Sequence, residues 1–250
     1  ASDVYKRQDV NLLFNKFYTP DKSRNKGSSG LGLYIVKELL KKIDGKIENV
    51  KRFAELGVRI MTLTWNDNNE IGSGVLSKDK CGLTDFGKLA ISEMEKYGNV
   101  IDISHASDEL FYDVANQTNK PFIATHSNSR TVTRNPRNLT DEQIKIIISR
   151  GGIIGLNLHN AFLNNNPDKA CTEDILRHCE YMLSLGCENF LCFGTDFDGC
   201  DLPKDIVGSD SIGGIYELFL KNNYNESILK KIFYENAYKF FENFDNQRIM

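Results

Sequence analysis

The sequence predicts an α/β fold made of parallel βα units, arranged either as a (β/α) barrel or as an open doubly wound sheet. Short apolar, β-branched runs recur from residue 59 onward, and segments with the capping residues of amphipathic helices lie between them. The length of 250 residues is close to that of one α/β barrel. No apolar run approaches the roughly 18 residues of a membrane-spanning helix, so no membrane span is predicted.

Five runs are predicted to be strands, because they are apolar nearly throughout, as strands buried on both faces should be. They are RIMTLTW (59–65), VIDISH (100–105), FIATH (122–126), GIIGLNL (152–158) and FLCFGTD (190–196). No GxGxxG motif follows a strand, which disfavours a dinucleotide-binding sheet. A closed barrel of this class needs eight strands, so about three are missing from the set.

The helices predicted between these strands each begin at a side chain that can accept a hydrogen bond from the first helical turn. The predicted starts are Thr84, Ser107, Thr140 with Gln143 in a capping box, and Thr172; the first of these helices ends before Gly98 and the last at Gly186.

Charge is divided unevenly along the chain. Residues 1–46 carry ten Lys and Arg against five Asp and Glu, a net of +5, whereas residues 47–250 carry 21 against 29, a net of −8. The basic segment lacks interleaved aromatic residues at a repeat, so a solvated surface is predicted and no nucleic-acid partner. Six cysteines without CxxC spacing disfavour a disulfide framework or a zinc ribbon. No signal peptide is recognised, and the predicted compartment is the cytoplasm.

Four of the five predicted strands end in a residue that can bind a ligand: Trp65, His105, His126 and Asp196. In parallel α/β folds the active site lies where strands end and the following loops begin. Imidazole nitrogens and carboxylate oxygens suit zinc. His105 and His126 are therefore candidate metal ligands, although spacing alone leaves open that they only cap their strands.

Two further residues are candidates for chemistry. Asp196, in GTDFDG, can exchange a proton with water or a leaving group, or can belong to an Asp-rich turn with Gly199 at positive φ. Arg137 precedes a helix and can bind a substrate carboxylate through two nitrogens, or can be a surface charge. His159 and His178 have no facing partner in the pattern and are predicted to be structural.

A series of ordered blocks resembles the membrane dipeptidase (renal dipeptidase) family of zinc peptidases from about residue 47 to about residue 243. The blocks are LTWNDNNEIGSG, GLTDFGKLAISEMEKYGNVIDISHAS, PFIATHSNSR, PRNLTDEQI, GGIIGLNL, FGTDFDG and ENAYKFF. The resemblance implies a (β/α)8 barrel that holds two zinc ions, bridged by a glutamate and a water, and hydrolyses dipeptides and some β-lactam-type amides.

Carried over to this sequence, the resemblance implies that His105 and His126 bind the second zinc ion. It implies that Asp196 is the acid/base carboxylate and that Arg137 holds the C-terminal carboxylate of the substrate. Trp65 stands where family members have a substrate-contacting histidine, and an indole NH can still donate.

The front of the sequence departs from the family. The family's His-x-Asp motif for the first zinc is not found, since none of the four histidines precedes His105. Glu38 is followed by two leucines and is predicted to be a helix residue rather than a metal ligand. We therefore expect residues 47–250 to form an incomplete (β/α)8 TIM-type barrel that lacks about the first three strands. It should hold at most one zinc ion, weakly, with impaired dipeptidase activity. The complete parent is a possible homodimer.

Residues 13–47 resemble the end of a sensor histidine kinase ATP-binding domain. Phe14 and Phe17 match its F box, and Gly30 to Leu33 match its GLGL turn. Residues 1–46 are therefore predicted to be a short, helical, foreign segment, the product of a chimera or an assembly artefact. The alternative function is an ATP-binding fragment in two-component signalling. Because the other motifs of that nucleotide pocket are absent, no nucleotide-binding residues are predicted.

Overall fold

The computed structural model describes residues 47–248. The chain divides into two compact units, Ala1–Asn49 and Val50–Met250, and nearly all described residues belong to the second. The predicted kinase-like segment, residues 1–46, lies outside the described residues.

Four short strands form two parallel pairs, with β1 beside β2 and β3 beside β4. Their bounds are β1 (Ile60–Thr62), β2 (Val100–Asp102), β3 (Ile154–Leu156) and β4 (Leu191–Phe193). Each lies inside one of the predicted apolar runs, and the parallel pairing confirms the predicted βα arrangement.

The fifth predicted strand, residues 122–126, joins the two pairs through single bridges. Ile123 bridges to Asp102 of β2, and Ala124 bridges to Ile154 of β3, both in parallel orientation. The spatial order is therefore β1, β2, residues 122–126, β3 and β4, which is also the order along the chain. This order places the carboxyl ends of all five segments at the same edge.

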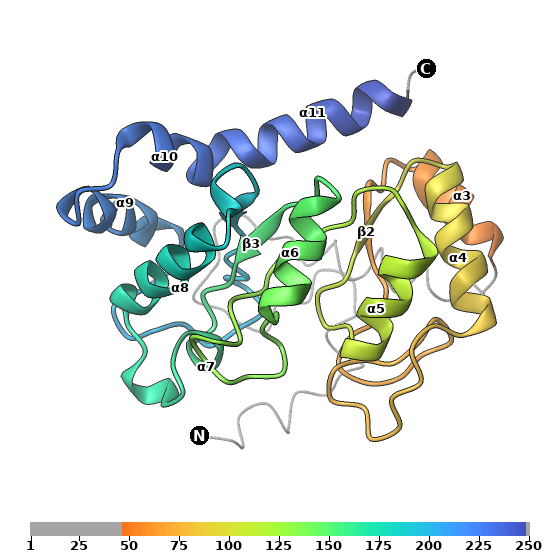
Figure 1. Ribbon diagram of the computed structural model, residues 1–250, viewed down its shortest axis with the longest axis horizontal. Helices are drawn as coiled ribbons and strands as arrows, with labels where there is room; N and C mark the ends of the chain where they lie inside the picture. The colour runs from red at the N-terminus through yellow and green to blue at the C-terminus, as the bar shows by residue number, and fades with distance from the viewer. Residues whose placement is uncertain (1–46, 249–250) are drawn as a thin grey trace, which may run out of the picture. The chain divides into compact units, whose positions relative to one another are not determined.

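Helices connect these strands and follow them along the chain (Figure 1). They are α3 (Glu48–Glu55), α4 (Asp85–Lys96), α5 (Asp108–Gln117), α6 (Asp141–Ser149), α7 (Asn160–Leu163), α8 (Thr172–Ser184), α9 (Ile212–Lys221), α10 (Glu226–Lys230) and, after a π-helical turn at Lys231–Glu235, α11 (Asn236–Arg248). In the part of the chain that the structure describes, no helix is long and apolar enough to cross a membrane.

Local capping sets three of the four predicted helix starts. Thr84, Ser107 and Thr140 each accept a hydrogen bond from a backbone N–H in the first turn, and Thr140 completes the predicted capping box. The prediction for α8 is corrected by one residue, because Thr172 is the first helical residue and Cys171 is the N-cap.

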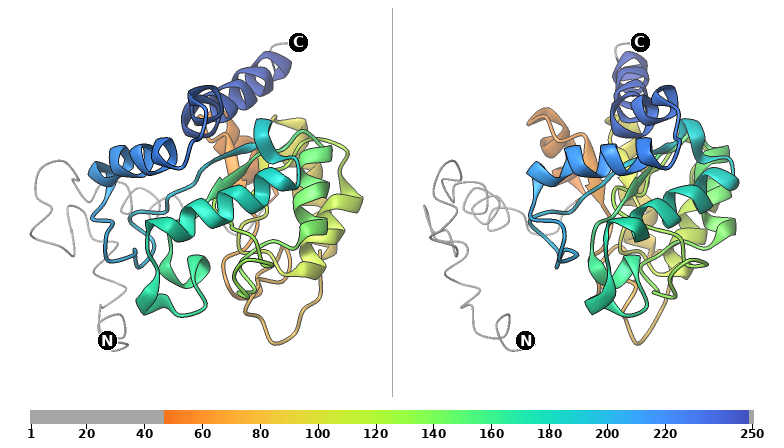
Figure 2. Two further views of the ribbon diagram at one scale, coloured as in Figure 1. Left: turned by 60° about the vertical axis from the view of Figure 1, so that its left-hand side comes forward. Right: turned by 90° about the vertical axis from the view of Figure 1, so that its left-hand side faces the viewer.

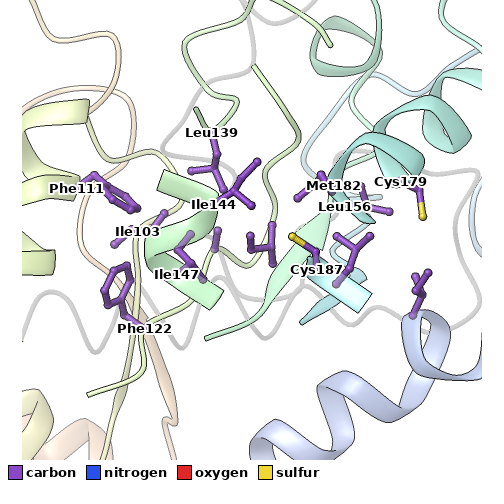
Figure 3. Close-up of a cluster of buried hydrophobic side chains, with 14 of the residues drawn as sticks. Ile103, Phe111, Phe122, Leu139, Ile144, Ile147, Leu156, Cys179, Met182 and Cys187 are labelled. Carbon is purple, nitrogen blue, oxygen red and sulfur yellow. The ribbon is translucent and has the colours of Figure 1, made fainter. Parts of the chain in front are cut away.

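The main hydrophobic core lies between the strands and helices α4, α5, α6 and α8, which follow one another across one face of the strands (Figures 1 and 2). Side chains that point from the strands to the helices meet aliphatic and aromatic side chains of the helices (Figure 3). Phe122 and Ile147 are fully buried in this cluster, and the ring of Phe122 packs edge-on against Phe111 of α5 at 5.7 Å between centroids. This core sets the spacing of the strands.

A second apolar cluster lies on the opposite face of the strands. Because side chains alternate along a strand, Val100, Ile123, Ile153 and Cys192 point away from the main core and pack together with Phe240 of α11. Helix α11 thus covers the amino-terminal part of this inner face.

The next inner-face positions, two residues further along each strand, are polar or glycine. Thr62 and Thr125 both donate from their hydroxyls to Asp102, each at 2.7 Å. A Cβ atom at Gly155 or Gly194 would lie 2.0 Å or 1.8 Å from the carbonyl oxygen of Thr125. Only glycine fits at these two positions, so the backbones of the β3 and β4 strands can pack directly against the carbonyl of Thr125.

The strands of residues 47–248 do not close into a barrel. Here β1 pairs only with β2 within its sheet, and β4 only with β3. Five strand segments are fewer than the eight of a closed (β/α)8 barrel. The described fold is therefore a parallel α/β arrangement with open ends.

Candidate metal centre

The site is built around two imidazoles that meet at the carboxyl ends of neighbouring strand segments. His105 follows β2 by three residues, and His126 ends the segment 122–126. Their Nε2 atoms lie 2.9 Å apart, with ring centroids 4.9 Å apart and the rings inclined by 61°. The predicted candidate ligands are therefore brought together.

The other ring nitrogen of each histidine has an oxygen partner. Nδ1 of His105 lies 2.8 Å from Oδ1 of Asn66, and Nδ1 of His126 lies 2.7 Å from Oγ1 of Thr125. An amide oxygen only accepts, so His105 carries its proton on Nδ1 and its lone pair on Nε2. Metal-binding histidines are typically oriented in this way, by a hydrogen bond from the nitrogen that does not bind the metal.

Both imidazoles are neutral at neutral pH. Burial, followed by the positive charge of Arg137 and the neighbouring His126, lowers the pKa of His105 to about 3. Burial and Arg137 also lower the pKa of His126, against the opposing charges of Asp102 and Asp196. Each neutral ring keeps a lone pair on one nitrogen, so the two Nε2 atoms can bind a cation between them when both rings carry their proton on Nδ1. The pair therefore fits a metal ion such as zinc.

Two imidazoles are fewer protein ligands than a catalytic zinc site usually has. No group of three or more His, Cys, Asp or Glu side chains suitable for a metal occurs among residues 47–248. Any further ligand must therefore be water, a side chain of another type, or a residue outside 47–248.

The carboxylate of Asp196 lies near this pair, since its negative charge raises the pKa of both His126 and Arg137. Its Oδ2 accepts a 3.3 Å hydrogen bond from Nδ2 of Asn157. Asp196 has a left-handed backbone with φ of 57°, and His105 has φ of 70°. Such conformations are unfavourable for non-glycine residues and occur preferentially at functional sites.

The TDFDG turn differs from its predicted form. An Asp-rich turn with Gly199 at positive φ was the alternative to a catalytic Asp196, but the left-handed residue is Asp196. A Cβ atom at Gly199 would lie 2.3 Å from Oδ1 of Asp196, so glycine leaves room for that carboxylate. The turn therefore presents the Asp196 carboxylate instead of only reversing the chain.

Arg137 is a buried cation beside the same site, with only 6% of its surface exposed. Its guanidinium lies 5.2 Å from the ring centre of Phe162 and makes a 3.4 Å hydrogen bond to the carbonyl of His126. Among residues 47–248, its buried Nε has no hydrogen-bond partner. Burial lowers its pKa to about 10, so it remains charged at neutral pH. The charges of Asp102 and Asp196 offset part of this burial, and an anionic ligand would supply the acceptor that Nε lacks.

Trp65 lies at the edge of the site, 71% exposed, with its ring 6.3 Å from that of His105. The two remaining histidines lie in other contacts. His159 precedes α7 and packs against Phe162. His178 is fully buried, and its ring nitrogens make hydrogen bonds with the backbone N–H of Ser129 and the carbonyl of Leu163.

A parallel α/β fold with two imidazoles, a carboxylate and a buried cation at the carboxyl ends of its strands is typical of metal-dependent hydrolases. Comparison with known proteins specifies the family. The sequence profile of the membrane dipeptidases, peptidase family M19, matches residues 12–248, and the chain belongs to this family.

Relatives and solved structures agree with this family. The chain is 32% identical to an uncharacterised protein from the pqqA 5′ region of Klebsiella pneumoniae, over 80% of this chain and 77% of that protein. It is 28% identical to an uncharacterised dipeptidase of Schizosaccharomyces pombe, over 79% of this chain but 48% of that protein. A Rhodobacter sphaeroides metallopeptidase, solved with a phosphinate mimic of the dipeptide L-Ala-D-Ala, superposes with a TM-score of 0.73 at 30% identity. That match covers 78% of this chain and 58% of the other.

The family match also bears on the start of the chain. It begins at residue 12 and so includes most of residues 1–46. The predicted origin of that segment in a histidine kinase therefore gains no support from the comparisons.

Proposed function

We propose that this chain carries part of a zinc-dependent dipeptidase site, in which His105 and His126 bind a zinc ion through their Nε2 atoms. The observation that carries the proposal is the 2.9 Å approach of these atoms, with both Nδ1 atoms facing oxygen partners. A zinc ion bound there supplies Lewis acidity, which lowers the pKa of water and polarises an amide carbonyl.

Asp196 is proposed to exchange the proton during hydrolysis. Its carboxylate accepts one hydrogen bond from Asn157, whose own Oδ1 accepts from the N–H of His159. The amide is thus held with its NH2 group toward Asp196, which leaves the other carboxylate oxygen available to a proton. A carboxylate in this position takes the proton from attacking water and passes it to the leaving amine.

Arg137 is proposed to bind the C-terminal carboxylate of the dipeptide. Its buried Nε has no partner, and its guanidinium is held over Phe162. A carboxylate would pair with two guanidinium nitrogens in one plane. Trp65 is proposed to contact the substrate from the exposed edge of the site, where its indole NH can donate.

The two imidazoles lead us to expect at most one weakly held zinc ion and slow turnover, because catalytic zinc usually has three protein ligands. The predicted cytoplasmic location and a homodimer of the complete parent stay predictions.

The proposal is tested by hydrolysis of L-Ala-D-Ala by the whole chain in excess zinc. Asp196→Asn should lower kcat by about 100-fold or more, while zinc content stays the same, because an amide cannot carry the proton. Asp198→Asn, the same change at an exposed aspartate of the same turn, is the matched control and should leave kcat within about twofold. No hydrolysis by the unmodified chain at saturating zinc, or normal turnover in Asp196→Asn, would overturn the proposal.

A further inference from the structure

We infer that Asp102 and Thr125 form a hydrogen-bonded relay that sets the tautomer of His126, keeping its proton on Nδ1 and its lone pair on Nε2. The inference rests on the proposed metal site, because it identifies residues that prepare one of its ligands. Asp102 and Thr125 are positioning residues, since they act on the site through the ring of His126.

Asp102 is a fully buried carboxylate whose partners are all donors. Its Oδ1 accepts the backbone N–H groups of Ser104 and Thr125, each at 3.0 Å. Its Oδ2 accepts the hydroxyls of Thr62 and Thr125, each at 2.7 Å. Four donors satisfy the charge of a buried carboxylate and are suited to its ionised form, which only accepts.

The hydroxyl of Thr125 has one proton and three neighbours that can accept it: Oδ2 of Asp102 and Nδ1 of His126, each at 2.7 Å, and Oγ of Ser104 at 3.2 Å. The charged oxygen of Asp102 takes it. Hydrogen bonds to a charged acceptor are about twice as strong as neutral ones, so this proton stays on the line to Oδ2. The oxygen of Thr125 can then only accept from Nδ1 of His126, 2.7 Å away. The His126 ring is therefore protonated on Nδ1.

The consequence concerns the second ring nitrogen. With the proton on Nδ1, Nε2 of His126 presents its lone pair toward Nε2 of His105, which is oriented in the same way by Asn66. In the opposite tautomer His126 would donate from Nε2 to His105, and that proton would block a metal. Asp102 thus affects the proposed metal position through the hydroxyl of Thr125 and the ring of His126.

The relay has a matched control within the same cluster. Thr62 donates to the same oxygen of Asp102 at the same distance as Thr125, but within the described part of the chain no hydrogen bond joins its hydroxyl to a histidine. Thr125→Val and Thr62→Val therefore remove equivalent bonds to one carboxylate, and only the first removes the acceptor for His126. Thr125→Ser restores that acceptor. Thr125→Val also removes a 3.2 Å contact with Oγ of Ser104.

Asp102→Asn tests the direction of the relay. The N–H groups of Ser104 and Thr125 require an oxygen at the Oδ1 position, so the new NH2 group would replace Oδ2 and point at the threonine hydroxyls. The amide then donates to Thr125, whose proton turns toward Nδ1 of His126. This substitution should move the His126 proton to Nε2.

The experiment uses the metal-free full chain labelled with 15N-histidine, because protonated and unprotonated ring nitrogens resonate far apart. The unmodified chain, Thr62→Val and Thr125→Ser should show His126 protonated on Nδ1. Thr125→Val and Asp102→Asn should shift the proton toward Nε2. In a separate titration with Zn²⁺, Thr125→Val should bind about 10- to 100-fold more weakly than Thr62→Val.

The two measurements separate this inference from the proposed function. If metal-free His126 carries its proton on Nε2 in the unmodified chain, or if Thr125→Val and Thr62→Val have the same tautomer, the relay is refuted. If the tautomers follow the expected order, the relay is supported even when the chain fails to hydrolyse dipeptides, an outcome that counts against the proposed function alone.

Discussion

Replacing Arg137 with methionine should make the folded chain more stable and at the same time remove its affinity for a carboxylate. The residue is a buried cation whose Nε has no partner among the described residues. It contacts the ring of Phe162 and the His126 carbonyl, and the charges of Asp102 and Asp196 offset only part of its burial. Burial of a charge without a full set of partners is unfavourable. Methionine keeps most of the apolar stem and adapts to irregular space.

The magnitude follows from the pKa of the buried group. Arg137 has a pKa of about 10 in the folded chain against an ordinary value of 12.5. This difference amounts to about 3 kcal/mol that folding loses by burying the charge, at about 1.4 kcal/mol for each tenfold change in acidity. Losing the contact with Phe162 offsets about 1 kcal/mol. Arg137→Met should therefore raise the free energy of unfolding by about 1–2 kcal/mol at neutral pH.

Urea denaturation of the metal-free chain, followed by circular dichroism, measures this change as a higher midpoint with an unchanged slope. The matched control is Arg134→Met, an exposed arginine in the same loop, which should change stability by less than about 0.5 kcal/mol. A loss of 1 kcal/mol or more in Arg137→Met would refute the reasoning, because it would mean that the guanidinium is well satisfied without a ligand.

The same two variants report on the carboxylate. N-acetylalanine, which carries the C-terminal carboxylate of a dipeptide, should raise the melting temperature of the unmodified chain and of Arg134→Met, because a ligand that binds only the folded state stabilises it. It should leave the melting temperature of Arg137→Met unchanged. Equal stabilisation of all three proteins would remove Arg137 from the proposed binding site.

Three further outcomes are expected. Gly194→Ala should destabilise the chain by more than about 2 kcal/mol in urea, since its Cβ would lie 1.8 Å from the carbonyl oxygen of Thr125, whereas Gly214→Ala in α9, with open space around it, should stabilise by about 0.5–1 kcal/mol. Burial lowers the pKa of His178 to about 4. Between pH 6.5 and pH 4 the unfolded chain therefore binds a proton at this histidine that the folded chain does not, and stability should fall as the pH drops. In thermal unfolding, His178→Gln should lose about 3 kcal/mol less stability over this range. Metal analysis after dialysis against zinc should find no more than one ion per chain, and two tightly held ions would contradict the site described.

Much of the candidate site could be predicted from which residues stand at the ends of the apolar runs. Parallel strands end at one edge, so the polar residues at the ends of the apolar runs were expected to meet. The structure places His105, His126 and Asp196 together in this way. The residues around them were missed, and only Asp102 had a visible signal, a charged residue inside the otherwise apolar VIDI run.

The hydrogen-bond partners could not be predicted because they come from distant parts of the chain. Asn66 reaches His105 across 39 residues, and Asn157 reaches Asp196 across the same separation. Nothing local to either amide indicates these contacts. Likewise, the TDFDG letters left open a glycine at positive φ, but the left-handed residue is Asp196, whose carboxylate lies beside Gly199.

The sequence by itself determined the helix starts at Thr84, Ser107 and Thr140 and the parallel direction of the strands, because capping and hydrophobic periodicity act within a few residues. Only the tertiary structure decided how the site is prepared. The inner faces of separate strands bring Asp102 and Thr125 to the imidazole of His126, and the packing of the loops buries the positive charge of Arg137 beside it. These effects depend on distances between strands and loops, which no local pattern of residues encodes.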